Sequence, residues 1–183
     1  MRLLWKWYLK STGWQTGVAF PFHHLQKYVL IVGPHTSNWD FIVGIAYRSY
    51  LGLGHVKFLG KKELFIPPLG YLFRSLGGIP ADRSQRTHLV EDAVKMFAGD
   101  ARFALALSPE GTRRKVEKLK TGFYHIARQA GVPVIMVGLD WKSKGILFSQ
   151  PLIISSEEND FKIILDFYRP IPGKYPVNGL RHL

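Results

Sequence analysis

Short apolar runs alternate along this chain with longer segments whose apolar residues recur every three or four positions. A short apolar run bounded by glycine or proline predicts a buried strand, and the longer recurrence predicts an amphipathic helix. The predicted strands cover residues 28–32, 56–59, 103–107, 133–139, 146–154 and 161–167, the last because apolar and polar residues alternate there. The predicted helices cover residues 2–16, a segment that starts at 37, 62–74 with a break at 67–68, 84–99 and 121–130.

Strands that alternate with helices are typical of α/β proteins. We therefore predict a mixed, mostly parallel sheet flanked by helices. The 183 residues suit a single domain over residues 1–183, and no segment resembles an interdomain linker. The longest apolar run, residues 132–139, is far shorter than the roughly 20 residues of a membrane span. We expect no secretory signal either, because lysines interrupt the apolar residues near the N-terminus.

The charge of the chain restricts its partners. The formal net charge is +12, so an anionic partner is expected: a nucleic acid, an anionic membrane or a phosphorylated substrate. Residues 1–60 carry six basic side chains and a single carboxylate, Asp40. The chain has no cysteine, which excludes disulfides, thiolate metal sites and cysteine nucleophiles. No group of His, Asp and Glu has metal-ligand spacing, so we expect neither a metal nor a cofactor.

A first candidate site lies in residues 33–40 (GPHTSNWD), between a predicted strand and a predicted helix. Ligands of open α/β sheets bind beyond the carboxyl ends of strands. His35 and Asp40 can meet if His35 lies in the turn and Asp40 in the first helical turn. A carboxylate on one ring nitrogen leaves the other as a general base. The structural alternative is a capping box made by Ser37 and Asp40.

A second candidate site, residues 108–113 (SPEGTR), directly follows the predicted strand 103–107. It combines a carboxylate, a flexible glycine, a hydroxyl and a guanidinium, and arginine suits bidentate phosphate binding. The alternative is a plain turn followed by a solvated basic run over 113–120. Residues 77–83 (GGIPADR) form a third candidate, for which a structural turn with a surface Asp-Arg ion pair is the alternative.

Taken together, these segments resemble the signature blocks of the glycerophospholipid acyltransferases, best known as the lysophosphatidic acid acyltransferase family. The blocks correspond to residues 35–40 (HTSNWD), 78–83 (GIPADR), 109–113 (PEGTR) and 132–137 (VPVIMV). The similarity covers about residues 28–140, which would form the motif-bearing core of the domain. One departure is Ser108, which stands where that family usually has an aromatic or aliphatic residue.

The resemblance implies a glycerolipid acyltransferase-like fold and an O-acyltransferase of phospholipid biosynthesis. The acyl group would pass from acyl-coenzyme A or an acyl carrier protein to a lysophospholipid hydroxyl. With 1-acyl-glycerol-3-phosphate as the acceptor, the product would be phosphatidic acid. An alternative is the same fold with another lysolipid or an aminolipid as acceptor.

The resemblance also implies residue roles. His35 would be the general base, and Asp40 would orient it. The acceptor phosphate would be held by Arg113, together with Arg83 or Lys61. The glycerol hydroxyls would be positioned by Glu110, Gly111 and Thr112.

Two further partners follow from charge. The basic run 113–120 could receive an acidic carrier protein, although such runs are more often solvated. A basic nucleic-acid-binding module is the alternative from another class. No nucleic-acid-binding signature accompanies the charge, so we expect no nucleic-acid partner.

The first 20 residues are predicted to contain a helix that lies on the membrane surface. Its basic residues recur every four positions, and three of the five tryptophans lie within residues 1–14. The basic stripe is Arg2, Lys6 and Lys10; the complementary stripe is Leu4, Trp7, Tyr8, Ser11 and Trp14. Indole favours the membrane interface, so we expect a peripheral protein at the cytoplasmic face of a membrane. The alternative is a helix packed on its own domain, with the tryptophans in the core.

Overall fold

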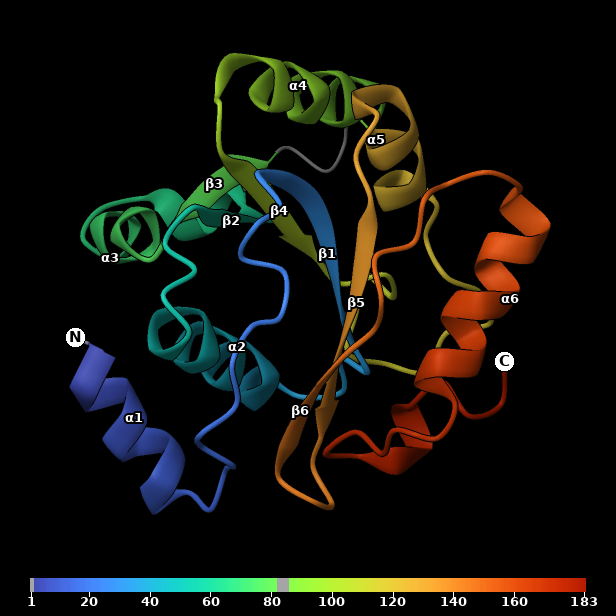
Figure 1. Cartoon of the computed structure of the whole chain (residues 1–183). Helices are drawn as coiled ribbons and strands as arrows, with labels where there is room; N and C mark the ends of the chain where they lie inside the picture. Colours follow the sequence, from blue (N-terminus) through green and yellow to red (C-terminus); the bar gives the residue numbers. More distant parts are fainter. Residues whose placement is uncertain (1, 82–85) are drawn as a thin grey trace.

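A computed structural model describes residues 2–81 and 86–183 of the chain, and in this part six strands form one mixed sheet (Figure 1). The spatial order is β3-β2-β4-β1-β5-β6. The strands are β1 (Lys27–Gly33), β2 (Val56–Lys61), β3 (Gly78–Ala81), β4 (Phe103–Leu107), β5 (Val134–Asp140) and β6 (Gly145–Phe148). All neighbours pair in parallel except β5 and β6, which are antiparallel. The predicted fold class is therefore confirmed.

Helices cover both faces of this sheet (Figure 1). They are α1 (Arg2–Ser11), α2 (Asn38–Tyr50), α3 (Leu69–Ser75), α4 (Arg86–Gly99), α5 (Gly122–Ala130) and α6 (Glu157–Tyr168). Two short 3₁₀ helices are η1 (Lys62–Phe65) and η2 (Pro176–Asn178). Among the described residues, no helix is both long enough and apolar enough to span a bilayer.

The two faces of the sheet form two hydrophobic cores, because successive strand side chains point to opposite faces. In β1, Tyr28 and Leu30 pack with α1 and α2, whereas Val29 and Ile31 pack with α4, α5 and α6. These β1 side chains are all 5% exposed or less. Such two-sided burial explains why β1 reads as a continuous apolar run.

The strand predicted over 161–167 is wrong, since these residues belong to helix α6. Apolar residues there also fit a helical period, and Ile164 and Tyr168 are fully buried on the same face. The Tyr168 hydroxyl donates to the carbonyl oxygen of Ile31 in β1, which attaches α6 to the sheet. Three acidic residues in the first turn stabilise the helix N-terminus.

Three smaller boundaries also differ from the prediction. Residues 78–81, expected as part of a turn, form the edge strand β3 along β2. The strand predicted over 146–154 is regular only over 145–148, with one further bridge at Leu152. Helix α1 ends at Ser11 rather than at 16, and Gly13 follows with a positive φ of 79°. The start of a helix at Ser84 falls outside the described residues.

Candidate functional site

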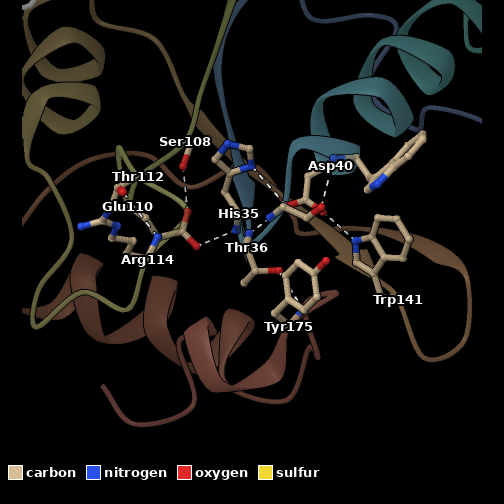
Figure 2. A network of polar contacts seen from close by, with 11 residues as sticks. His35, Thr36, Asp40, Ser108, Glu110, Thr112, Arg114, Trp141 and Tyr175 are labelled. Atoms are coloured by element: carbon tan, nitrogen blue, oxygen red, sulfur yellow. Dashed lines mark hydrogen bonds and ion pairs between the residues drawn. The ribbon is translucent and has the colours of Figure 1, made fainter.

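The candidate segments follow the carboxyl ends of neighbouring parallel strands, so the fold gathers them at one edge of the sheet. Residues 33–40 follow β1, and 108–113 follow β4, which is paired with β1 in parallel. Strand β5 flanks β1 on its other side and ends at Asp140. This edge is where ligands bind in open α/β sheets, and Figure 2 shows the polar network that connects the segments there.

His35 and Asp40 lie next to each other, with Nδ1 of the histidine 3.2 Å from Oδ2 of the carboxylate. The Asp40 side chain is 3% exposed and that of His35 is 24% exposed. The contact between His35 and Asp40 that the spacing suggested is therefore present, and so is the capping box. Asp40 Oδ2 accepts the backbone N–H groups of Thr36 and Ser37, each at 2.7 Å, and so completes the capping box of α2. Because Asp40 is bonded at Nδ1, the imidazole has Nε2 left to accept a proton.

Trp141 completes the surroundings of Asp40, and this role was not predicted from the sequence. Its indole Nε1–H donates to Asp40 Oδ1 at 2.7 Å (Figure 2). The ring is held by two cations, with Lys144 Nζ 4.4 Å and Lys174 Nζ 4.7 Å from its centroid. A partial signal was present in the sequence, because Trp141 follows the predicted strand 133–139 by two positions and so lies at a strand end, where ligands bind in α/β sheets.

Residues 172–175 also approach the site, and nothing in their sequence pattern indicated this. The backbone N–H of Tyr175 donates to Thr36 Oγ1 at 3.2 Å, and that of Trp141 donates to the carbonyl oxygen of Pro172 at 3.1 Å. Gly173 is required between them, since a Cβ there would lie 2.7 Å from Thr36 Cγ2. Residues 172–175, which are not part of the sheet, therefore hold in place the turn that contains His35.

Glu110 is buried at 1% exposure, and both of its carboxylate oxygens bind protein groups. Oε1 accepts the backbone N–H of His35 at 2.7 Å, and Oε2 accepts the hydroxyl of Ser108 at 2.8 Å (Figure 2). Burial raises the pKa of the Glu110 carboxyl, while these two hydrogen bonds act against the rise. The structure therefore joins the β4 segment to the histidine turn through Glu110, and it gives Ser108 a defined polar partner.

Arg113, to which a phosphate-binding role was assigned from the sequence, lies near residues 36–39, which directly follow His35. It lines a hollow of about 230 Å³ together with Tyr175 and the first residues of α2. The remaining lining residues are Thr36, Ser37, Asn38 and Trp39. Lys174 lies at the same place, with its Nζ 5.0 Å from the Trp39 ring centroid. The hollow is therefore lined by the cation Arg113 and by hydroxyl groups near the His35–Asp40 pair, and Lys174 lies on the Trp39 ring beside it.

Gly111 and Thr112 shape the loop that presents Arg113. Gly111 has a φ of 65°, a conformation that favours glycine, and Lys120 N–H donates to the carbonyl oxygen of Pro109 at 2.7 Å. Thr112 is exposed, and its Oγ1 accepts the backbone N–H of Arg114 at 3.4 Å. Neither residue is among those that line the hollow.

Of the two remaining predicted cations, Lys61 alone is among the residues that the structure describes. Lys61 is exposed at the carboxyl end of β2, beside Ala81 of β3, and it does not line the hollow. Arg83 lies outside the described residues. No group of three or more His, Asp or Glu that could hold a metal occurs within 2–81 and 86–183.

Comparisons with known proteins agree with the fold and the motifs. The chain is 33% identical over 114 residues to a 1-acyl-sn-glycerol-3-phosphate acyltransferase of Haemophilus influenzae, covering 59% of this chain and 46% of that protein. It is 32% identical over 124 residues to the Escherichia coli K12 protein of the same name, covering 64% and 49%. An uncharacterised acyltransferase of Schizosaccharomyces pombe is 33% identical over 171 residues, covering 85% and 57%. The chain thus spans about half the length of the relatives it matches.

The fold also has a solved counterpart. The crystal structure of the 1-acyl-sn-glycerophosphate acyltransferase from Thermotoga maritima is similar, with a TM-score of 0.64. The alignment covers 91% of this chain and 74% of that one at 20% identity, so it supports the fold alone. A family model described as acyltransferase matches residues 19–140, which is more than half of the chain and includes all three candidate segments, 33–40, 77–83 and 108–113. This chain therefore belongs to the acyltransferase family.

Proposed function

We propose that this chain transfers a fatty acyl group from an acyl thioester to a hydroxyl of a lysophospholipid. The proposed acceptor is 1-acyl-glycerol-3-phosphate, which gives phosphatidic acid as the product. The observation that carries the proposal is the contact between His35 and the buried Asp40 beside a cationic hollow. The names of the Haemophilus and Escherichia relatives support the same acceptor.

In this mechanism His35 acts as the general base. Its Nε2 takes the proton of the acceptor hydroxyl as that oxygen forms a bond to the thioester carbonyl carbon. The tetrahedral intermediate collapses by breaking the carbon–sulfur bond, and the proton passes from the imidazolium to the departing thiolate. The products are an ester and a free thiol. Asp40 holds the proton on Nδ1 and stabilises the imidazolium.

The acceptor phosphate is assigned to Arg113, whose guanidinium can bind two phosphate oxygens at once. Its place in the hollow next to the first turn of α2 supports this assignment. Gly111 and Thr112 are assigned to the glycerol region, whereas Glu110 is assigned to holding the backbone of His35, because its oxygens bind protein groups. Lys61 and Arg83 remain proposed as further cations for the acceptor.

The acyl donor is proposed to be acyl-coenzyme A or an acyl carrier protein. Both are anionic, and the exposed basic residues of the run 113–120 suit either one. The proposed chemistry uses only proton transfer and positioning of the two substrates, so it requires no cofactor or metal. No step of the proposed reaction involves a nucleic acid.

The location that fits this function is the cytoplasmic face of a membrane, with α1 on the lipid surface. Leu3, Leu4 and Trp7 are 81%, 62% and 67% exposed, which supports this. The helix also packs on its own domain, since Leu9 is fully buried and Arg2 Nε donates to the carbonyl oxygen of Tyr50. The α1 surface offered to lipid is therefore Leu3, Leu4 and Trp7, with Lys6 and Lys10 also exposed.

Two residues of the predicted lipid-facing stripe lie elsewhere. Trp14 is 3% exposed in the core, and Tyr8 packs against that core. Removing residues 1–16 would therefore delete core side chains as well as the lipid-facing ones. A sharper test replaces Leu4 and Trp7 with serine in the full chain and measures the fraction that sediments with anionic vesicles.

The function is tested with the purified chain, a panel of lysolipids and aminolipids, and both donor types. We expect ester formation on 1-acyl-glycerol-3-phosphate, with stoichiometric release of thiol, and a rate lower by about 100-fold or more with His35→Ala. If the chain prefers another lysolipid, the proposed acyl transfer stands, but 1-acyl-glycerol-3-phosphate is not the acceptor. Absence of transfer to every acceptor from both donors would overturn the proposal.

A further inference from the structure

A cluster of exposed apolar side chains covers η1, α3 and the turn between them, outside the candidate site. Five of the large apolar side chains in residues 64–72 are 40% to 72% exposed. We call this set the α3 surface: Leu64, Ile66, Leu69, Tyr71 and Leu72. Single exposed apolar residues are ordinary on protein surfaces, but a contiguous set points to an interaction.

The α3 surface is the outer side of a tightly built segment. On the inner side Phe65 is buried at 6% exposure, and its ring centroid lies 5.9 Å from that of Phe73. Gly70 allows α3 to pack directly on η1, since a Cβ there would clash with the Phe65 carbonyl oxygen. The exposure of Ile66 and Leu69 therefore belongs to an ordered fold with separate inner and outer faces.

Three exposed cations lie within or directly beside the segment that carries the α3 surface. Lys61, Lys62 and Arg74 are exposed, and Glu63 is the single acidic residue within 61–74. An apolar patch with a cationic margin complements an anionic lipid surface, which offers acyl chains below negatively charged headgroups. The +12 charge of the whole chain favours the same partner.

The α3 surface is also connected to the candidate site. The ring of Phe41, the residue after Asp40, lies 6.0 Å from the Phe73 ring of α3 and 5.1 Å from the Phe58 ring of β2. The segment that carries the surface therefore packs against the first turn of α2, where Asp40 is held.

We propose that the α3 surface is a second lipid-contacting surface, which inserts Ile66, Leu69 and Leu72 into the interface of an anionic bilayer. It rests on the proposed function in one respect, that the acceptor is an amphiphile dissolved in that bilayer. Contact at η1–α3 brings the lipid surface to the element that packs beside Asp40. The surface acts in addition to α1 and depends on side chains separate from those of that helix.

The test compares two double variants of the full chain. Ile66→Ser with Leu72→Ser removes side chains that are 63% and 54% exposed, whereas the control, Ile153→Ser with Ile163→Ser, removes side chains that are 70% and 47% exposed. Each protein is sedimented with phosphatidylcholine vesicles containing roughly one third phosphatidylglycerol. We expect the apparent affinity to fall about tenfold or more for the first variant and less than about twofold for the control. Equal affinities of the two variants would overturn the proposal.

Three measurements distinguish lipid contact from misfolding, self-association and a direct effect on catalysis. Circular dichroism melting must show that the first variant keeps its fold; if it does not, Leu69→Ser alone is tested against Ile153→Ser. Sedimentation velocity without lipid shows whether the α3 surface joins two copies of the chain, and loss of a dimer in the variant would overturn the lipid assignment. A short-chain, water-soluble acceptor should be acylated at an unchanged rate by the variant. If the wild type acylates no acceptor, the proposed function fails while the vesicle comparison still decides the lipid contact.

Discussion

The indole nitrogen of Trp141 lies 2.7 Å from Oδ1 of Asp40, although the two residues are 101 positions apart in the chain. The other oxygen, Oδ2, accepts two backbone N–H groups of the α2 turn and lies 3.2 Å from His35 Nδ1. Both oxygens of this carboxylate are thus engaged, and the side chain has little freedom to rotate. Trp141 is therefore a positioning residue for the His35–Asp40 pair.

Replacing Trp141 with phenylalanine should lower kcat while the KM values for both substrates change less than about twofold. The phenyl ring keeps most of the packing but donates no hydrogen bond to Asp40, so the histidine is less well oriented. We expect a loss of roughly tenfold or more, since a misplacement of about 1 Å can cost 100-fold in rate. Steady-state kinetics measure this, with Trp14→Phe as the control, because Trp14 packs on Trp141 without bonding to Asp40. Equal kcat losses in both variants would remove the positioning role.

His35→Ala should reduce acyl transfer by about 100-fold or more, because general-base catalysis contributes about that much. A His35→Ala variant with turnover near that of the wild type would contradict the mechanism.

Asp40→Asn should lower turnover strongly and also destabilise the fold. The carboxylate accepts three N–H groups, and an amide has a single acceptor oxygen, so the free energy of unfolding should fall by about 1–3 kcal/mol. Turnover assays and urea denaturation measure the two effects.

Arg113→Ala should raise KM for the lysophospholipid about tenfold or more and leave KM for the acyl donor nearly unchanged. Loss of a hydrogen bond to a charged group costs about 1.5–3 kcal/mol, and Arg113→Lys should restore only part of it because the bidentate geometry is lost. The neighbouring Arg114→Ala is the matched control, since Arg114 is also exposed but does not line the hollow. Similar increases in KM for both substrates would contradict the phosphate role.

Glu110→Gln should remove a pH-dependent contribution to stability. Burial raises the pKa of this carboxyl in the folded state above its ordinary value of 4.5, so the folded protein binds more protons than the unfolded chain. The contribution of Glu110 to the free energy of unfolding is therefore greatest below pH 4.5, and it falls as the pH rises through the raised pKa. The difference in unfolding free energy, wild type minus variant, should decrease in urea titrations as the pH rises above the ordinary pKa of 4.5. A difference that increases with pH would contradict the raised pKa of Glu110.

Much of the fold could be predicted from the order of apolar segments, because strands buried on both faces read as continuous apolar runs. The segments of β1, β4 and β5 were located to within a few residues for that reason. Helix α6 was mistaken for a strand because its apolar residues fit both periods over a short stretch. The hydroxyl of Tyr168, which reaches the sheet only from a helix packed on it, shows which period the packing selects.

The candidate site likewise combines features that the sequence predicts with features that only the tertiary structure shows. The sequence by itself determined which residue types follow the strand ends, and local spacing was enough to suggest the His35–Asp40 contact and the capping box. Only the tertiary structure decided that Trp141 donates to Asp40, that Glu110 bonds the backbone of His35, and that residues 172–175 close against Thr36. These contacts join segments 75 to 139 positions apart. Their geometry depends on strand order and register, which the pattern of one segment does not encode.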